Sequence, residues 1–165
     1  MKIHQLKTVQ RLNMSLEEAW DFFSSPLNLG KITPAKLKFH ILSNLGDGKM
    51  YPGQLIKYHV TPLLGIKMYW VTEITHVEDG KFFVDEQRVG PYAMWHHQHH
   101  FKEIPGGVEM TDIVDYGLPL GPLGAIAHGL FVKRQVEEIF NYRYKVLEEL
   151  FGEPQVPAEA AAPAA

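Results

Sequence analysis

Four of the chain's nine histidines fall in one short stretch, Trp95-His96-His97-Gln98-His99-His100-Phe101. The runs on either side have the composition of β-strands, and a strand points alternate side chains to opposite faces. One face therefore carries Trp95, His97, His99 and Phe101, and the other carries His96, Gln98 and His100. Two aromatic rings bracket the first set, which predicts that this face is buried. Buried imidazoles need hydrogen-bonding partners, whereas His96 and His100 are expected to face solvent.

A partner for these histidines is available on the next predicted strand. The turn Pro105-Gly106-Gly107 predicts a hairpin, and Asp112 is expected to face His97 and His99 across it, since opposed side chains in a hairpin lie close together. The preceding strand could add polar groups beside Phe83. The resulting candidate site consists of Trp70, Phe83, Asp85, Gln87, Trp95, His97, His99, Phe101, Asp112 and Tyr116. Arg143, on the predicted C-terminal helix, is a further candidate.

Several kinds of chemistry are compatible with this set. The polar groups could orient a ligand in an apolar pocket, and this interpretation is favoured. His97, His99 and Asp112 are also candidate catalytic residues for general acid–base chemistry. The same three could bind a metal ion, but two histidines two residues apart are not a zinc signature, and neither a metal nor a cofactor is expected. A buried polar network that only fixes strand register is the remaining alternative.

Composition excludes several other functions. The chain has 165 residues, 45% of them apolar, with a net charge of -3 and no cysteine. One domain of this size can bury a sizeable core. The acidic balance argues against nucleic-acid binding, and the absence of cysteine excludes thiol chemistry and disulfides. With no signal peptide and no apolar run long enough to span a bilayer, a cytoplasmic protein without stable membrane insertion is expected.

Hydrophobic periodicity predicts the order of the elements. A strand over 2–13 is followed by a helix that starts at the capping box Ser15-Leu16-Glu17-Glu18 and by a helical turn over 27–33. A period of two then predicts strands over 38–43, 53–61, 66–78, 81–88, 92–104 and 108–118. The Pro/Gly-rich segment 119–124 is expected to break the sheet, as a hinge or tight turn, before one long helix over 125–151. The Pro/Ala-rich residues 153–165 are expected to be a disordered tail.

This order predicts an α+β fold in which a curved seven-stranded antiparallel sheet wraps around the C-terminal helix. It resembles the helix-grip fold of the START/Bet v 1-like (SRPBCC) superfamily over residues 1–152. The motifs that resemble a bacterial branch, labelled cyclase/dehydrase-like or cell-division-inhibitor-like, are Phe83-x-Asp85-x-Gln87-x-x-Gly90-Pro91-Tyr92, Trp95-x-His97-x-His99-x-Phe101, Met110-x-Asp112-x-Val114-x-Tyr116, Pro119-x-Gly121-x-x-Gly124 and Ile139-Phe140-x-Tyr142-Arg143.

The element order itself predicts a cavity between sheet and helix, because one helix cannot fill the concave side of a seven-stranded sheet. In line with the resemblance, this cavity is expected to bind a hydrophobic or amphipathic, lipid- or polyketide-like small molecule. Two alternatives stay open. One is a cofactor-independent polyketide cyclase or dehydratase that uses the same His and Asp residues, and the other is a protein–protein regulator with a vestigial pocket. The sequence leaves the oligomeric state and the identity of the ligand open.

Overall fold

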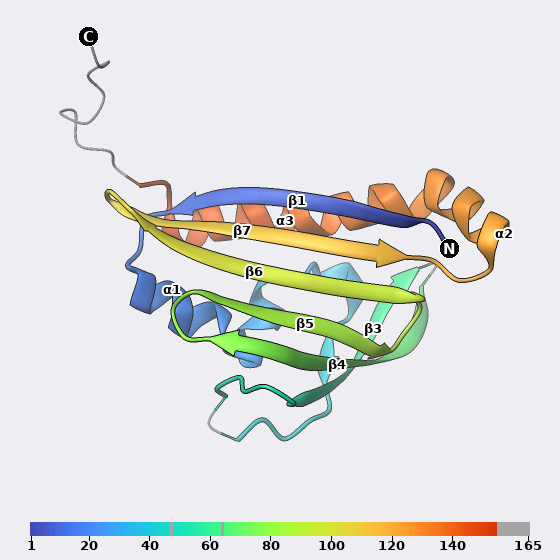
Figure 1. The fold of residues 1–165 in the computed structure, drawn as a ribbon, viewed down its shortest axis with the longest axis horizontal. Helices are drawn as coiled ribbons and strands as arrows, with labels where there is room; N and C mark the ends of the chain where they lie inside the picture. Colours follow the sequence, from blue (N-terminus) through green and yellow to red (C-terminus); the bar gives the residue numbers. More distant parts are fainter. Residues whose placement is uncertain (47, 64, 155–165) are drawn as a thin grey trace, which may run out of the picture.

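The protein folds into one large sheet with a long helix across it (Figure 1). The structure is a computed structural model, and it describes residues 1–46, 48–63 and 65–154. The strands are β1 (Ile3–Leu12), β2 (His40–Ile41), β3 (Leu55–Leu63), β4 (Ile66–Glu78), β5 (Phe82–Val89), β6 (Met94–Ile104) and β7 (Gly107–Gly117). The helical segments are α1 (Leu16–Phe23), η1 (Pro26–Ile32), η2 (Ala35–Leu37), α2 (Gly121–Ala127), η3 (His128–Val132) and α3 (Lys133–Phe151).

All seven strands form a single antiparallel sheet in the order β1-β7-β6-β5-β4-β3-β2. Strands β3 to β7 are joined by short turns, so each pairs with the next along the chain. β1 pairs with β7, and the segment containing α1, η1 and η2 leads from this edge to β2 at the opposite edge. This arrangement confirms the predicted helix-grip architecture.

The first helix begins at the predicted capping box. The Ser15 hydroxyl accepts a hydrogen bond from the Glu18 backbone N–H at 3.2 Å, and the Glu18 carboxylate accepts one from the Ser15 backbone N–H at 2.8 Å. Ala19 and Phe23 are buried against the sheet, because the apolar residues recur at helical spacing. The capping box therefore fixes the residue at which α1 begins and so places its apolar face against the sheet.

We expect Ser15→Ala to lower the free energy of unfolding by about 1 kcal/mol, because the substitution removes the acceptor for a backbone donor at the start of the helix. Ser15→Asp, which keeps an acceptor at the cap, should retain most of the stability. Urea denaturation of the two variants measures the difference. Equal stability of Ser15→Ala and the wild type would show that the cap does not contribute.

The C-terminal helix begins four residues earlier than predicted, at Gly121 rather than Ala125. The prediction treated Gly121-Pro122-Leu123-Gly124 as a break, hinge or tight turn, and that was wrong. Pro122 lies in the first helical turn, where its missing N–H costs nothing. Gly124 is needed there because a Cβ would lie 2.1 Å from the Pro119 carbonyl oxygen. The helix then widens into the π-helical segment η3 before α3.

The strand predicted over 38–43 is the other clear difference, since only His40 and Ile41 pair with β3. Lys38 adopts a left-handed backbone conformation with φ of 46°, which no strand accommodates. This edge strand is therefore cut short at its start. Short edge strands limit unwanted pairing with other chains.

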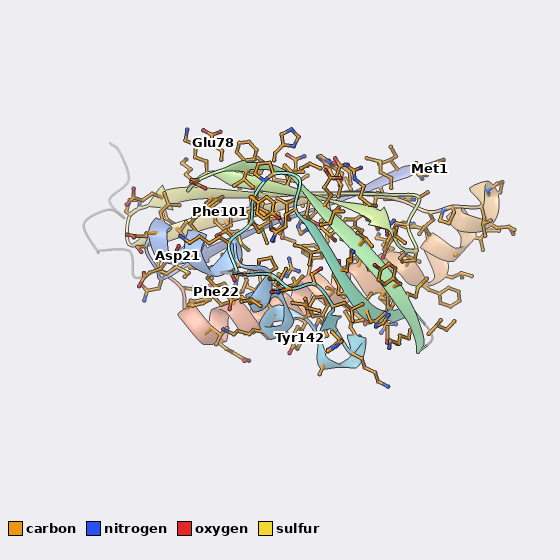
Figure 2. The ribbon with its side chains drawn as sticks, turned by 90° about the horizontal axis from the view of Figure 1, so that it is seen from below. Met1, Asp21, Phe22, Glu78, Phe101 and Tyr142 are labelled. Carbon is orange, nitrogen blue, oxygen red and sulfur yellow. The ribbon has the colours of Figure 1, made fainter. Side chains whose placement is uncertain are left out.

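The core lies between the sheet and the helical segments that pack against it, α1, η1, η2 and α3 (Figure 2). One end of it is closed by α1, where Trp20 and Phe23 pack edge-on or tilted against Phe101. Leu147, on α3, is fully buried in the same cluster. No helix among the described residues is long and apolar enough to cross a membrane. Of the predicted disordered tail, residues 155–165 lie outside the described part of the chain.

Candidate functional site

A cavity of about 160 Å³ lies between the sheet and α3. Its wall is mostly apolar and aromatic, with side chains from β3 to β7, from α3 and from the segments after α1. The residues that line it on the sheet side include Ile56, Tyr58, Val60, Trp70, Thr72, Ile74, Phe83, Asp85, Tyr92, Trp95, His97, His99 and Met110. A few polar groups on an otherwise apolar surface are typical of small-molecule sites.

Four polar side chains form one cluster on three neighbouring strands. Asp85 of β5 lies opposite His97 of β6, and Asp112 of β7 lies opposite His99 of β6. His97 and His99 are two residues apart and so share the inward face of β6. Their ring centroids are 3.8 Å apart. The strand register therefore assembles two carboxylates and two imidazoles into one compact group.

Each histidine contacts both carboxylates. His97 Nδ1 lies 3.2 Å from Asp85 Oδ2 and His97 Nε2 lies 3.3 Å from Asp112 Oδ1. His99 Nε2 donates to Asp85 Oδ2 at 3.1 Å, while His99 Nδ1 lies 2.8 Å from Asp112 Oδ1. That last contact is close but is poorly aligned as a hydrogen bond. The predicted pairing of Asp112 with the two histidines is thus present, and Asp85 joins it from the other side.

The cluster is buried, and its electrostatics follow from that. Asp112 is 2% exposed and His97 is 4% exposed. Burial alone would raise the pKa of both carboxyl groups, but the adjacent histidines outweigh it and hold the pKa of Asp85 and of Asp112 well below the usual range. Burial likewise opposes the charged form of His97, yet Asp85 and Asp112 raise the pKa of its imidazole. Such a group can hydrogen-bond a ligand oxygen, hold a proton or bind a cation.

Not every predicted site residue lies at the cavity. Trp70, Phe83, Asp85, Trp95, His97 and His99 line it, whereas Gln87, Phe101, Asp112 and Tyr116 are not among its lining residues. Asp112 lies behind the histidines. Phe101 is covered by α1. The inward face of the sheet is thus wider than the cavity, which occupies only its middle part.

The remaining two predicted residues, Gln87 and Tyr116, make hydrogen bonds that stabilise other parts of the structure. The Gln87 side chain donates to the Tyr92 carbonyl at 2.7 Å and accepts from the Tyr92 N–H at 3.2 Å, and so fixes the turn between β5 and β6. The Tyr116 hydroxyl pairs with His128 Nε2 at 2.9 Å under η3. Neither the Gln87 side chain nor the Tyr116 side chain lines the cavity, although Tyr92, to which Gln87 is hydrogen-bonded, does. The outward histidines are less exposed than predicted, because His96 contacts Glu86 at 2.9 Å and His100 stacks on Phe82.

Sequence reasoning missed several residues of the cavity wall. On the sheet, the Thr72 hydroxyl accepts the indole N–H of Trp70 at 3.1 Å and lies 3.0 Å from the Tyr58 hydroxyl. The alternation in β3 and β4 could have identified both, since Tyr58 and Thr72 share the inward face with Trp70. On the helix side, Ile139, Phe140 and Arg143 line the cavity. Arg143, the weaker candidate, is therefore placed at the site.

Comparison with known proteins supports the fold. No family model matches the chain, and no curated protein matches it. Solved structures do match over most of the chain. A protein from Chromobacterium violaceum, CV1439, is 15% identical with a TM-score of 0.68, covering 90% of this chain and 97% of that one. The major latex-like protein 151 of Panax ginseng is 12% identical with a TM-score of 0.65, covering 90% and 97%.

A third solved structure gives the same result. Ara h 8.0201 is 14% identical with a TM-score of 0.58, and the match covers 90% of this chain and 99% of that one. Together with the element order and the sheet topology, these similarities show that the chain has the Bet v 1/START-like fold. At such low identity the likeness concerns the fold alone.

Proposed function

We propose that this protein binds a hydrophobic or amphipathic small molecule, lipid- or polyketide-like, in the cavity between the sheet and α3. The observation that carries this proposal is the cavity itself, whose aromatic and aliphatic wall is interrupted by a few inward polar groups. Small-molecule sites usually have this composition. The fold resemblance leads to the same expectation.

The size of the cavity limits the part of the ligand that it can enclose. An apolar cavity of about 150 Å³ holds a single benzene ring, and the volume here is about 160 Å³. A ring or short chain therefore fits without rearrangement. A larger ligand extends between the half-buried side chains of η1 and the following loop, such as Leu29, Phe39 and Met50, which line the same cavity.

Arg143 makes the cavity favour a ligand that carries a hydrogen-bond acceptor. Its Nε is buried and has no hydrogen-bond partner among the described residues, and its guanidinium lies 5.0 Å from the centre of the Phe140 ring. A buried donor without an acceptor costs free energy, and an acceptor on the ligand would remove this cost. We therefore propose that the ligand carries a carboxylate or another oxygen acceptor directed toward α3.

The test uses the fluorescent probe 1-anilinonaphthalene-8-sulfonate, which combines aromatic rings with one anionic group. Trp70 and Trp95 line the cavity, whereas Trp20 is not among its lining residues. We expect one probe per chain, with energy transfer from these tryptophans and a saturable rise in probe emission. Absence of saturable binding, together with absence of any stabilising apolar ligand in a thermal-shift screen, would contradict the proposal.

Arg143→Gln should weaken probe binding by about 10–100-fold, because an interaction with a charged hydrogen-bonding partner is worth about 1.5–3 kcal/mol. Arg134→Gln is the matched control, since Arg134 lies on the same helix with its side chain 85% exposed. Titration of both variants measures the difference. An equal effect of the two substitutions would mean that Arg143 does not contact the anionic group.

A further inference from the structure

We infer that Asp85, His97 and His99 form a binding site for one divalent transition-metal ion of the zinc type. Asp85 Oδ2 lies 3.2 Å from His97 Nδ1 and 3.1 Å from His99 Nε2. The three side chains each offer a ligand atom within 4.8 Å of the other two. Two ligands at a tetrahedral angle on Zn²⁺, with bonds of about 2.1 Å, are about 3.4 Å apart. The two distances from Asp85 are thus close to those around a bound ion, and the ligand atoms of His97 and His99 lie within 4.8 Å of each other.

Asp112 completes the arrangement from behind. Its Oδ1 lies 3.3 Å from His97 Nε2 and 2.8 Å from His99 Nδ1, so it contacts the nitrogen of each ring that does not contact Asp85. A histidine that binds a metal through one nitrogen usually donates its other N–H to a carboxylate or carbonyl, which fixes the tautomer and the ring orientation. Asp112 can accept this hydrogen bond from His97, and its Oδ1 lies close to the corresponding nitrogen of His99, although that contact is poorly aligned as a hydrogen bond.

The donor atoms of the cluster favour a transition-metal ion. Two imidazole nitrogens and one carboxylate oxygen suit zinc and its first-row neighbours rather than calcium or magnesium.

The position of the three ligands indicates what the ion could do. Asp85, His97 and His99 line the cavity, whereas Asp112 does not. A zinc ion with three protein ligands keeps a fourth position for water or a ligand oxygen, and that position would face the cavity. The inference does not rest on the proposed ligand binding, because metal uptake can be measured with no organic ligand present.

The test is a metal titration of tag-free protein that has been stripped with EDTA and dialysed. We expect calorimetry with ZnCl₂ to give one site per chain with a Kd in the micromolar range or below. We expect CoCl₂ to give visible absorption bands of a four- or five-coordinate site. Asp85→Asn and His99→Asn should each weaken binding at least about a hundredfold, and Asp112→Asn about 10–100-fold.

The control variants carry His96→Ala with His100→Ala, which removes the outward pair of the same strand, and His4→Ala, which removes a histidine stacked 3.4 Å from His128. Both should bind zinc like the wild type, and circular dichroism should show that every variant is folded. The inference is overturned if the wild type takes up neither ion. It is also overturned if uptake survives Asp85→Asn and His99→Asn, or if it is lost with His4→Ala.

Discussion

Replacement of Asp112 with alanine is expected to lower the free energy of unfolding by about 3–5 kcal/mol, the usual effect of removing one partner from a buried ionic group. Asp112 is 2% exposed and contacts both buried histidines. Its loss leaves Asp85 as the only carboxylate of the cluster and leaves His97 Nε2 without its acceptor. Urea denaturation at neutral pH measures the effect.

Asp115→Ala is the matched control for this prediction. Asp115 lies on the same strand, and its carboxylate accepts a hydrogen bond from Gln5 at 2.9 Å in an exposed position. Its replacement should change the free energy of unfolding by less than about 0.5 kcal/mol, as is usual at the surface. If Asp112→Ala lowers the free energy of unfolding by no more than Asp115→Ala does, the buried cluster does not stabilise the fold.

Ile139→Trp is expected to weaken binding of the anilinonaphthalene probe by roughly a hundredfold, since a cavity that holds about one ring cannot accommodate both an added indole and a ligand. Ile139 lies on α3 and lines the cavity. The protein should remain folded, because overfilling an interior costs about 1–3 kcal/mol. Probe titration and thermal melting are measured on the same samples.

Tyr142→Trp provides the comparison, because Tyr142 lies on the same helix but is 38% exposed and does not line the cavity. This variant should bind the probe like the wild type. Undiminished binding by Ile139→Trp would place the probe elsewhere on the protein. Equal losses in both variants would indicate a general effect of the added indole.

The sequence was sufficient to predict the fold because its local signals agree with one another. β4 has the predicted bounds of Ile66 and Glu78, since its apolar run ends at an Asp-Gly turn. The inward face of β6 was also predicted correctly, and His97 and His99 are buried on it. The start of the C-terminal helix was not predicted, because Pro122 and the adjacent glycines read equally well as a break or as a first turn.

The limits of the site were harder to predict because they depend on the elements that cover the sheet. Alternation places Phe101, His97 and Tyr116 on one face, but only packing decides that α1 covers Phe101 and that η3 covers Tyr116. Spacing alone also suggested Asp112 as the carboxylate nearest to a metal or ligand. The register places Asp85 at the cavity instead, with Asp112 behind the histidines.

The central claim is that the cavity between the sheet and α3 holds a small molecule, and native mass spectrometry tests it most directly. Wild-type protein and Ile139→Trp are incubated with the same apolar cell extract, desalted and sprayed under non-denaturing conditions. The claim predicts that the wild type gains the mass of one small molecule per chain, which denaturation releases, and that Ile139→Trp gains none. Wild-type protein that keeps only the mass of its own chain, or equal uptake by both proteins, would contradict the claim.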